Sequence, residues 1–328
     1  MVAMEQRAIE RMGRSFSVVG LGTWQLGADW GTVDAQAARS VLETAVEHGV
    51  TFFDTADVYG DGLSERFCAE LRARHPEVVL ATKMGRRVEQ LTENYSREHL
   101  LAWNDRSRAN LGVEQIDLVQ LHCPPDGVYA SDEVFDALDE MVAEGRVRAY
   151  GVSVETCAQA LAAIARPHVA TVQIIFNCFR LKPLEKVLPA AREAGVGIIA
   201  RVPLASGLLS GNYDEHTAFA PDDHRSFNRQ GEAFDVGETF AGVPFEVGLA
   251  AVRELRGLVA ADVPMARFAL RWVIDQPGVS TVIPGARNSD QVLQNVAAAA
   301  MDPLSEEQLA GVRDVYDRLI RPHVHARW

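Results

Sequence analysis

The chain has 328 residues, 48% hydrophobic and 23% charged, and a formal net charge of −13 at pH 7. This composition is typical of a folded globular protein and excludes the disordered and fibrous classes. The acidity argues against nucleic acid or an anionic membrane as a partner, because both attract positive charge. The sequence has no apolar stretch long enough for a membrane helix and no apolar signal-peptide core. Its four cysteines suggest no disulfide framework, so we expect a protein of the reducing cytoplasm.

Strand-like runs alternate with helix-like segments along the chain, a pattern typical of a parallel sheet wrapped by helices. The chain begins with a predicted β-hairpin around residues 8–18. Eight strands are then predicted at Val18–Leu21, Thr51–Asp54, Val78–Lys83, Ile116–His122, Val147–Ser153, Thr171–Ile175, Gly197–Val202 and Ser280–Pro284.

The intervening helices are predicted from apolar spacing and from capping residues such as Ser131. They span Ala35–His48, Ser64–His75, Arg97–Leu111, Ser131–Glu144, Ala158–Ile164, Leu184–Ala194, Met265–Asp275 and Asp290–Ala299. Two further helices, Phe245–Ala260 and Ser305–Ile320, fall outside the repeat, and Ser206–Val243 is interpreted as a functional barrel loop. The fold class is therefore α/β: a (β/α)8 TIM barrel with an N-terminal β-hairpin and extra C-terminal helices, in a single domain spanning residues 1–328.

Four chemically suited residues lie at or just after the ends of predicted strands. Asp54 ends the run TFFD, Tyr59 follows in a turn-like segment, and Lys83 and His122 end two later strands. The carboxyl ends of all strands converge on one face of a parallel barrel, so these side chains can meet there. An ammonium beside a tyrosine favours the tyrosinate, a carboxylate can hold that ammonium in place, and a histidine can hydrogen-bond a substrate oxygen. The set predicts a proton-donor site.

In type and order, Asp54, Tyr59, Lys83 and His122 resemble the catalytic tetrad of the aldo-keto reductase family. The resemblance extends from Gly20 to Asn295, nearly the whole chain. It implies an NADP(H)-dependent enzyme that reduces the aldehyde or ketone group of a small molecule, with Tyr59 as general acid. An alternative in the same family is a cofactor-sensing regulatory subunit with little catalytic role.

The sequence has no glycine-rich Rossmann fingerprint, so a barrel must hold the dinucleotide differently. The resemblance implies that Ser153 and Gln173 bind the nicotinamide carboxamide. It further places Gly22, Thr23, Trp24 and Asp54 at the nicotinamide end, and at the pyrophosphate a segment that includes Pro203, Leu204, Ser206, Gly207, Leu209 and Gly211.

The run from strand eight into a helix is an anion site on physical grounds, since free N–H groups and the helix dipole point at it. Here the resemblance implies that Arg287 and Gln291 surround the adenosine 2′-phosphate and that Gln294 and Asn295 hold the adenine. Gly285, in the same run, is a further predicted cofactor-binding residue. Two positions depart from commoner family patterns. Val154 stands where asparagine is frequent, and Arg201 stands where an aromatic residue often stacks on the nicotinamide, so a guanidinium would take that place.

The four cysteines show no CxxC or zinc spacing, and no metal is predicted. Cys123 stays open between a small buried hydrophobe and a reactive thiol or metal ligand. A metal-dependent hydrolase using Asp54, His122 and Cys123 is disfavoured, because catalytic metals normally take three protein ligands and no second histidine ends a strand nearby. Sugar, aliphatic aldehyde, pyridoxal-type and steroid substrates all stay open. Candidate pocket walls are Trp24, Trp30 and Trp103.

Overall fold

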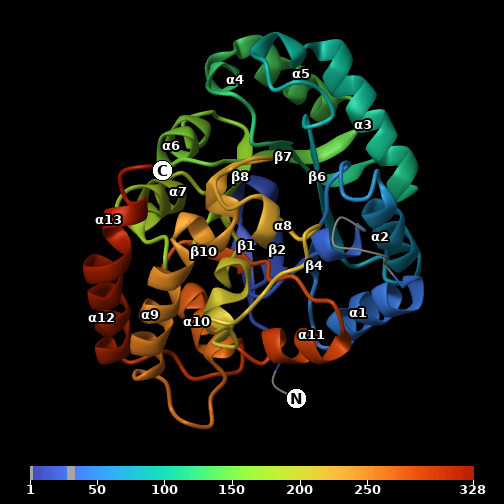
Figure 1. The fold of residues 1–328 in the computed structure, drawn as a ribbon. Coiled ribbons are helices and arrows are strands. Elements are labelled where there is room, and N and C mark those ends of the chain that lie inside the picture. The colour runs from blue at the N-terminus through green and yellow to red at the C-terminus, as the bar shows by residue number, and fades with distance from the viewer. Residues whose placement is uncertain (1–2, 28–33) are drawn as a thin grey trace.

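A parallel barrel occupies the centre of the protein and a ring of helices surrounds it (Figure 1). The computed structural model describes residues 3–27 and 34–328. The barrel is one eight-stranded sheet in sequential order, with every neighbouring pair parallel. Its strands are β3 (Leu21–Gly22), β4 (Phe52–Asp54), β5 (Val79–Met84), β6 (Ile116–His122), β7 (Val147–Ser153), β8 (Val169–Ile175), β9 (Gly197–Arg201) and β10 (Val279–Val282).

The first and last strands meet and close the barrel. Parallel bridges join Val19 to Val282 and Gly22 to Gly285. The amide of Gly20 donates to the carbonyl of Val282 at 2.9 Å. The predicted strand Val18–Leu21 is therefore in the right place, but its regular part, β3, is shorter and lies further along. The predicted barrel is confirmed, with most strand ends within one or two residues of those expected.

The N-terminal hairpin closes the bottom of the barrel. It consists of β1 (Gln6–Ile9) and β2 (Arg14–Ser17), paired antiparallel. Phe16 of the hairpin stacks on Phe52 of β4 with ring centroids 4.1 Å apart, inside an apolar cluster that fills the barrel interior. Because this end is plugged, the open end is the one where the strands reach their carboxyl termini.

Amphipathic helices cover the outside of the barrel and bury their apolar faces against it. The described helices are α1 (Ala35–Glu47), α2 (Leu63–Arg74), α3 (Arg97–Leu111), α4 (Asp126–Ala130), α5 (Asp132–Ala143), α6 (Cys157–Ile164), α7 (Val187–Glu193), α8 (His224–Phe227), α9 (Phe245–Arg256), α10 (Met265–Ile274), α11 (Ser289–Val296), α12 (Glu306–Val315) and α13 (Arg321–Val324). Of these, the short α8 lies over the open end of the barrel and not on its outside. None of the described helices is both long and apolar enough to cross a membrane.

Helix starts follow the capping rules unevenly. Ser305 caps α12 and forms a capping box with Gln308, as its sequence predicts. Ser131 occupies the N-cap position of α5 as predicted, but its side chain makes no cap hydrogen bond. The short helix α4, which the sequence did not predict, ends directly before it.

The segment predicted as a loop after β9 is largely ordered by its own packing. It contains α8 and three short 3-10 helices at Ala205–Ser210, Val236–Glu238 and Phe240–Gly242. The ring of Phe219 packs against those of Phe240 and Phe245, at 5.7 and 6.0 Å between centroids. This packing gives the segment a fixed shape over the open end of the barrel.

Candidate active site

Three strands bring the four tetrad residues together at the open end of the barrel. The Nζ atom of Lys83, on β5, lies 2.5 Å from Oδ2 of Asp54, on β4, and 3.3 Å from the hydroxyl of Tyr59. Lys83 and Asp54 are buried, with side-chain exposures of 1% and 3%. The ring of His122, from the end of β6, meets the ring of Tyr59 edge-on at 6.1 Å. The four side chains thus form one contiguous group.

Asp54 is held by more than its ion pair. Its Oδ1 atom accepts hydrogen bonds from the side-chain amides of Gln120 at 3.0 Å and Gln173 at 2.8 Å. Lys83 also donates to the backbone carbonyl of Thr55 at 2.9 Å. These bonds satisfy a buried charge pair, which would otherwise carry a large desolvation cost. Gln120 is a site residue that the sequence analysis missed, because an inward-facing glutamine within an apolar strand gives no signal of its own.

The local electrostatics assign protonation states to three of the four residues. Burial raises the pKa of Tyr59, as do the charges of Asp54 and Glu238, and Lys83 offsets only part of this, so the net direction is upward. Burial alone would lower the pKa of Lys83, but Asp54 and Tyr59 outweigh it and raise it. Burial, together with Arg86, Lys83 and Arg201, depresses the pKa of His122 well below its usual value. At neutral pH Tyr59 therefore carries its proton, Lys83 is an ammonium and His122 is a neutral imidazole.

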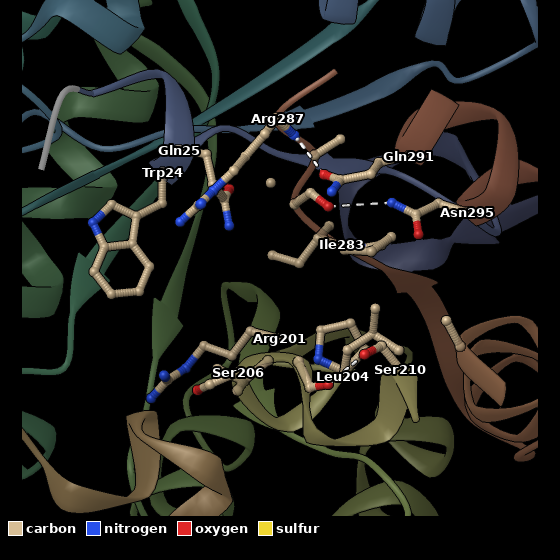
Figure 2. Close-up of a pocket in the computed structure, with 18 of the residues that line it drawn as sticks. Trp24, Gln25, Arg201, Leu204, Ser206, Ser210, Ile283, Arg287, Gln291 and Asn295 are labelled. Carbon is tan, nitrogen blue, oxygen red and sulfur yellow. Dashed lines mark hydrogen bonds between the residues drawn. The ribbon is translucent and has the colours of Figure 1, made fainter. Parts of the chain in front are cut away.

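A cavity of about 1090 Å³ runs from the tetrad across the open end of the barrel. Figure 2 shows Trp24 and Arg201 toward one end and Gln291 and Asn295 toward the other. Its size fits an extended organic ligand. All of the predicted cofactor-binding residues except Leu209 line it, and so do all tetrad residues except Lys83. Leu209 is fully buried and packs in the core, while Lys83 lies behind Tyr59.

The segment predicted at the pyrophosphate has an unusual backbone. Ala205, Ser206 and Gly207 all have positive φ values, of 48°, 54° and 96°. Non-glycine residues occupy this region only when the surroundings hold them there, and such turns often mark ligand sites. Here the hydroxyl of Ser206 donates to the carbonyl of Glu238 at 3.0 Å and accepts from the amide of Phe240 at 3.1 Å.

The helix start after β10 forms the far end of the cavity. The backbone amide of Arg287 donates to the side chain of Gln291 at 2.8 Å, and Asn295 donates to the carbonyl of Gly285 at 3.2 Å (Figure 2). Asn288 caps this helix through the amide of Gln291. Gln294 accepts a hydrogen bond from Arg267, a second arginine at this end that the sequence analysis did not single out.

Aromatic rings line the tetrad end. The ring of Trp24 lies 6.2 Å from that of Tyr59, 5.2 Å from that of His224 and 6.0 Å from that of Phe234. Burial lowers the pKa of His224 to about 4, so this histidine is neutral. Trp103 does not line the cavity: it is buried on α3 beside Tyr95. Trp30 lies outside the described residues.

Arg201 lines the cavity but its charge is compensated. Its Nη2 atom lies 2.8 Å from the carboxylate of Glu155, and its Nη1 atom lies 3.5 Å from that of Glu238. Arg86 contacts the same two carboxylates, at 3.1 and 3.2 Å. A stacking role of Arg201 on a nicotinamide stays a prediction, and the paired carboxylates weaken any charge effect of that guanidinium. The sequence analysis missed Arg86, Glu155 and Glu238, because nothing local marks charges that meet only in the folded chain.

Comparison with known proteins places this site in a family. A sequence model of the aldo/keto reductase family matches residues 18–317, so the chain belongs to that family. It is 30% identical to aldo-keto reductase YhdN of Bacillus subtilis over 88% of this chain and 87% of that protein. A probable voltage-gated potassium channel subunit beta of Arabidopsis thaliana is 26% identical over 92% and 93%.

Two solved structures extend the comparison to the fold. The glycerol dehydrogenase AKR11B4 from Gluconobacter oxydans superimposes with a TM-score of 0.79 at 30% identity, covering 96% of each chain. An aldo-keto reductase from Klebsiella pneumoniae in complex with NADPH superimposes with a TM-score of 0.70 at 25% identity, again over 96% of each chain.

Proposed function

We propose that the protein is an NADP(H)-dependent oxidoreductase that reduces an aldehyde or ketone of a small molecule to an alcohol. The observation that carries this proposal is the contact of Lys83 with both Asp54 and Tyr59 at the end of a long cavity. Tyr59 keeps its proton at neutral pH, as a general acid requires. Family membership and the NADPH complex of the Klebsiella relative support the same function.

In this proposal Tyr59 gives the proton of its hydroxyl to the carbonyl oxygen as that oxygen gains negative charge. Lys83, 3.3 Å from the phenolic oxygen, stabilises the tyrosinate left behind, and Asp54 keeps the ammonium in place. Neutral His122, beside Tyr59, hydrogen-bonds the same substrate oxygen and orients it. In the oxidation direction Tyr59 is the base.

The cavity suits the expected cofactor. Ser153 and Gln173, then Ser206 and Gly207 of the strained turn, and then Arg287, Gln291 and Asn295 at the helix start all line it. These residues would hold the nicotinamide, the pyrophosphate and the adenosine end, in that order. A bound reduced nicotinamide dinucleotide supplies the hydride.

A carbonyl panel tests the function directly. The purified protein is titrated with NADPH by fluorescence and then assayed for NADPH oxidation with short aldehydes, hydroxy-aldehydes, pyridoxal-type and steroid carbonyls. We expect tight cofactor binding and turnover of at least one class. Absence of turnover with the whole panel, despite cofactor binding, would contradict the enzymatic proposal.

The second candidate is a cofactor-sensing subunit that acts through a partner, which the similarity to the potassium channel subunit favours. The two proposals differ in what the tetrad does. A sensing subunit binds NADPH with high affinity but turns over carbonyls slowly at any substrate concentration. Single-turnover measurement of NADPH oxidation separates the two, because it reports the chemical step without product release.

Cofactor preference is a further prediction. If Arg287 contacts the 2′-phosphate, Arg287→Ala should weaken NADPH binding about ten- to a hundred-fold and leave NADH binding nearly unchanged, as expected for a charge-assisted contact of about 1.5–3 kcal/mol. Fluorescence titration with both cofactors measures this. Arg39→Ala, which removes an exposed arginine paired with Glu70 on the outer helices, is the control. An unchanged NADPH-to-NADH ratio in Arg287→Ala would remove Arg287 from this role.

A further inference from the structure

The first question is what orients the imidazole ring of His122. Its Nδ1 atom is buried and makes no hydrogen bond within the described residues. Catalytic histidines commonly have one ring nitrogen fixed by a carboxylate or carbonyl. The direction of this ring must therefore be set through its backbone and through the packing around it.

The peptide bond between His122 and Cys123 is held by hydrogen bonds at both its carbonyl and its amide, next to a strained residue. Cys123, the next residue, has a φ of 52°, in a region that non-glycine residues rarely occupy. Its amide donates to the carbonyl of Ser153 at 3.0 Å. The carbonyl of His122 accepts a hydrogen bond from Nε of Arg86 at 3.3 Å. Arg86 lies three residues beyond Lys83, so it connects the segment after β5 to the end of β6.

The Nη2 atom of the Arg86 guanidinium belongs to a buried network of four charges. This atom contacts Glu155, in the segment after β7, and Glu238, in the long segment after β9. Arg201 of β9 binds the same two carboxylates. The four side chains are between 9% and 23% exposed. Each of these partly buried charges is stabilised by the others, because removing one leaves its partner unpaired and poorly solvated.

Glu238 connects this network to the cofactor end of the cavity. Its carboxylate lines the cavity, and its backbone carbonyl accepts the hydroxyl of Ser206 at 3.0 Å. Ser206 lies in the strained turn proposed for the pyrophosphate. A continuous chain of contacts therefore runs from Ser206 through Glu238 and Arg86 to the backbone of His122.

We propose that Arg86 is a positioning residue that fixes His122 through its carbonyl and, through Glu238, links that position to the segment covering the cofactor cavity. Arginine suits this task because its rigid guanidinium can bind a carbonyl through Nε and carboxylates through Nη2 at the same time, whereas the single ammonium of lysine cannot hold that geometry. The proposal rests on the proposed reductase function.

A metal site is the competing interpretation of the same cluster. Ligand atoms of Cys123, Glu155 and Glu238 all lie within 4.8 Å of one another. However, Arg86 and Arg201 already bind both carboxylates and would repel a cation. Burial also raises the pKa of Cys123 to about 12, so its thiol keeps its proton and is a poor ligand. The arrangement favours the positioning role.

The test compares Arg86→Lys with Arg72→Lys. Arg72 is the matched control, since its side chain is 24% exposed against 23% for Arg86 and it binds Asp117 at 2.6 Å, on the segment that begins β6. We expect Arg86→Lys to fold and to bind NADPH within about three-fold of wild type but to lose about 10²-fold in kcat, the size of effect that a misplaced catalytic group produces. Arg72→Lys should keep the wild-type kcat.

Glu238→Gln and the double variant provide the second measurement. Glu238→Gln weakens the contact between Arg86 and residue 238 but leaves the hydrogen bond from Arg86 to the carbonyl of His122 in place, so a smaller loss in kcat is expected. Arg86→Lys/Glu238→Gln should be no slower than Arg86→Lys alone, because residues acting as one unit are not additive. A kcat within about three-fold of wild type in Arg86→Lys, or fully additive losses in the double variant, would overturn the proposal. Turnover of the wild-type protein is measured separately, so a failure of the proposed reductase function can be told apart from a failure of the positioning role of Arg86.

Discussion

Replacing Tyr59 with phenylalanine should abolish carbonyl reduction while leaving NADPH affinity nearly unchanged. The hydroxyl is needed for proton transfer, whereas the ring, packed between Trp24 and His122, is retained in phenylalanine. Loss of a general acid costs about 10² to 10⁴ in rate. The prediction is checked by kcat on the best substrate of the panel, with cofactor affinity measured by fluorescence titration.

A matched control separates this loss from the removal of a buried phenol. The hydroxyl of Tyr150, on β7, donates to Asp139 at 2.8 Å, on the helix side of the barrel. Tyr150→Phe therefore removes a phenolic hydroxyl and a hydrogen bond to a charged group away from the site, and should keep the wild-type kcat. If Tyr59→Phe retained more than about half of wild-type turnover, Tyr59 could not be the general acid.

The sequence predicts the barrel and the tetrad because both have local signals. Most strands lie within apolar runs, and Asp54, Lys83 and His122 stand at or next to the ends of such runs, so one topological rule brings them to the same face. Element ends are less well predicted. Helix α4 is an example: it is five residues long, too short for an apolar period to be visible.

The buried charge network was not predictable in the same way. Arg86, Glu155 and Glu238 are individually typical of solvated loops, and only the folded chain brings them into contact with Arg201. Their meeting depends on the path of the segment after β9, whose shape comes from packing among aromatic residues such as Phe219 and Phe240. Propensity and period carry no information about such contacts, which form between residues far apart in sequence.

The effect of Lys83 on Tyr59 gives a prediction with a definite sign. Lys83 lowers the pKa of Tyr59, against the larger opposing effect of burial. Removing the ammonium in Lys83→Met should therefore raise that pKa further. In alcohol oxidation, where Tyr59 is the base, the rate rises as Tyr59 ionises, so the rising limb of the pH profile should move to higher pH. At pH values below that limb, the rate of alcohol oxidation should fall about tenfold for each pH unit by which the limb moves.

Lys83→Met also leaves Asp54 buried without its cation, which by itself can destabilise a protein by about 3–5 kcal/mol. The double variant Lys83→Met/Asp54→Asn removes both charges and keeps the hydrogen bonds from Gln120 and Gln173 to the side-chain oxygen of residue 54 possible. We expect it to fold and to show a smaller upward shift in the pH profile than Lys83→Met alone, because Lys83 lowers the pKa of Tyr59 by more than Asp54 raises it. In a Tyr59→Phe background the same pair of changes should add little to the loss of rate, because the group they act on is gone. A double variant with the wild-type rate and pH profile would show that Lys83 does not act on Tyr59, and the proton donor would then have to work without electrostatic assistance.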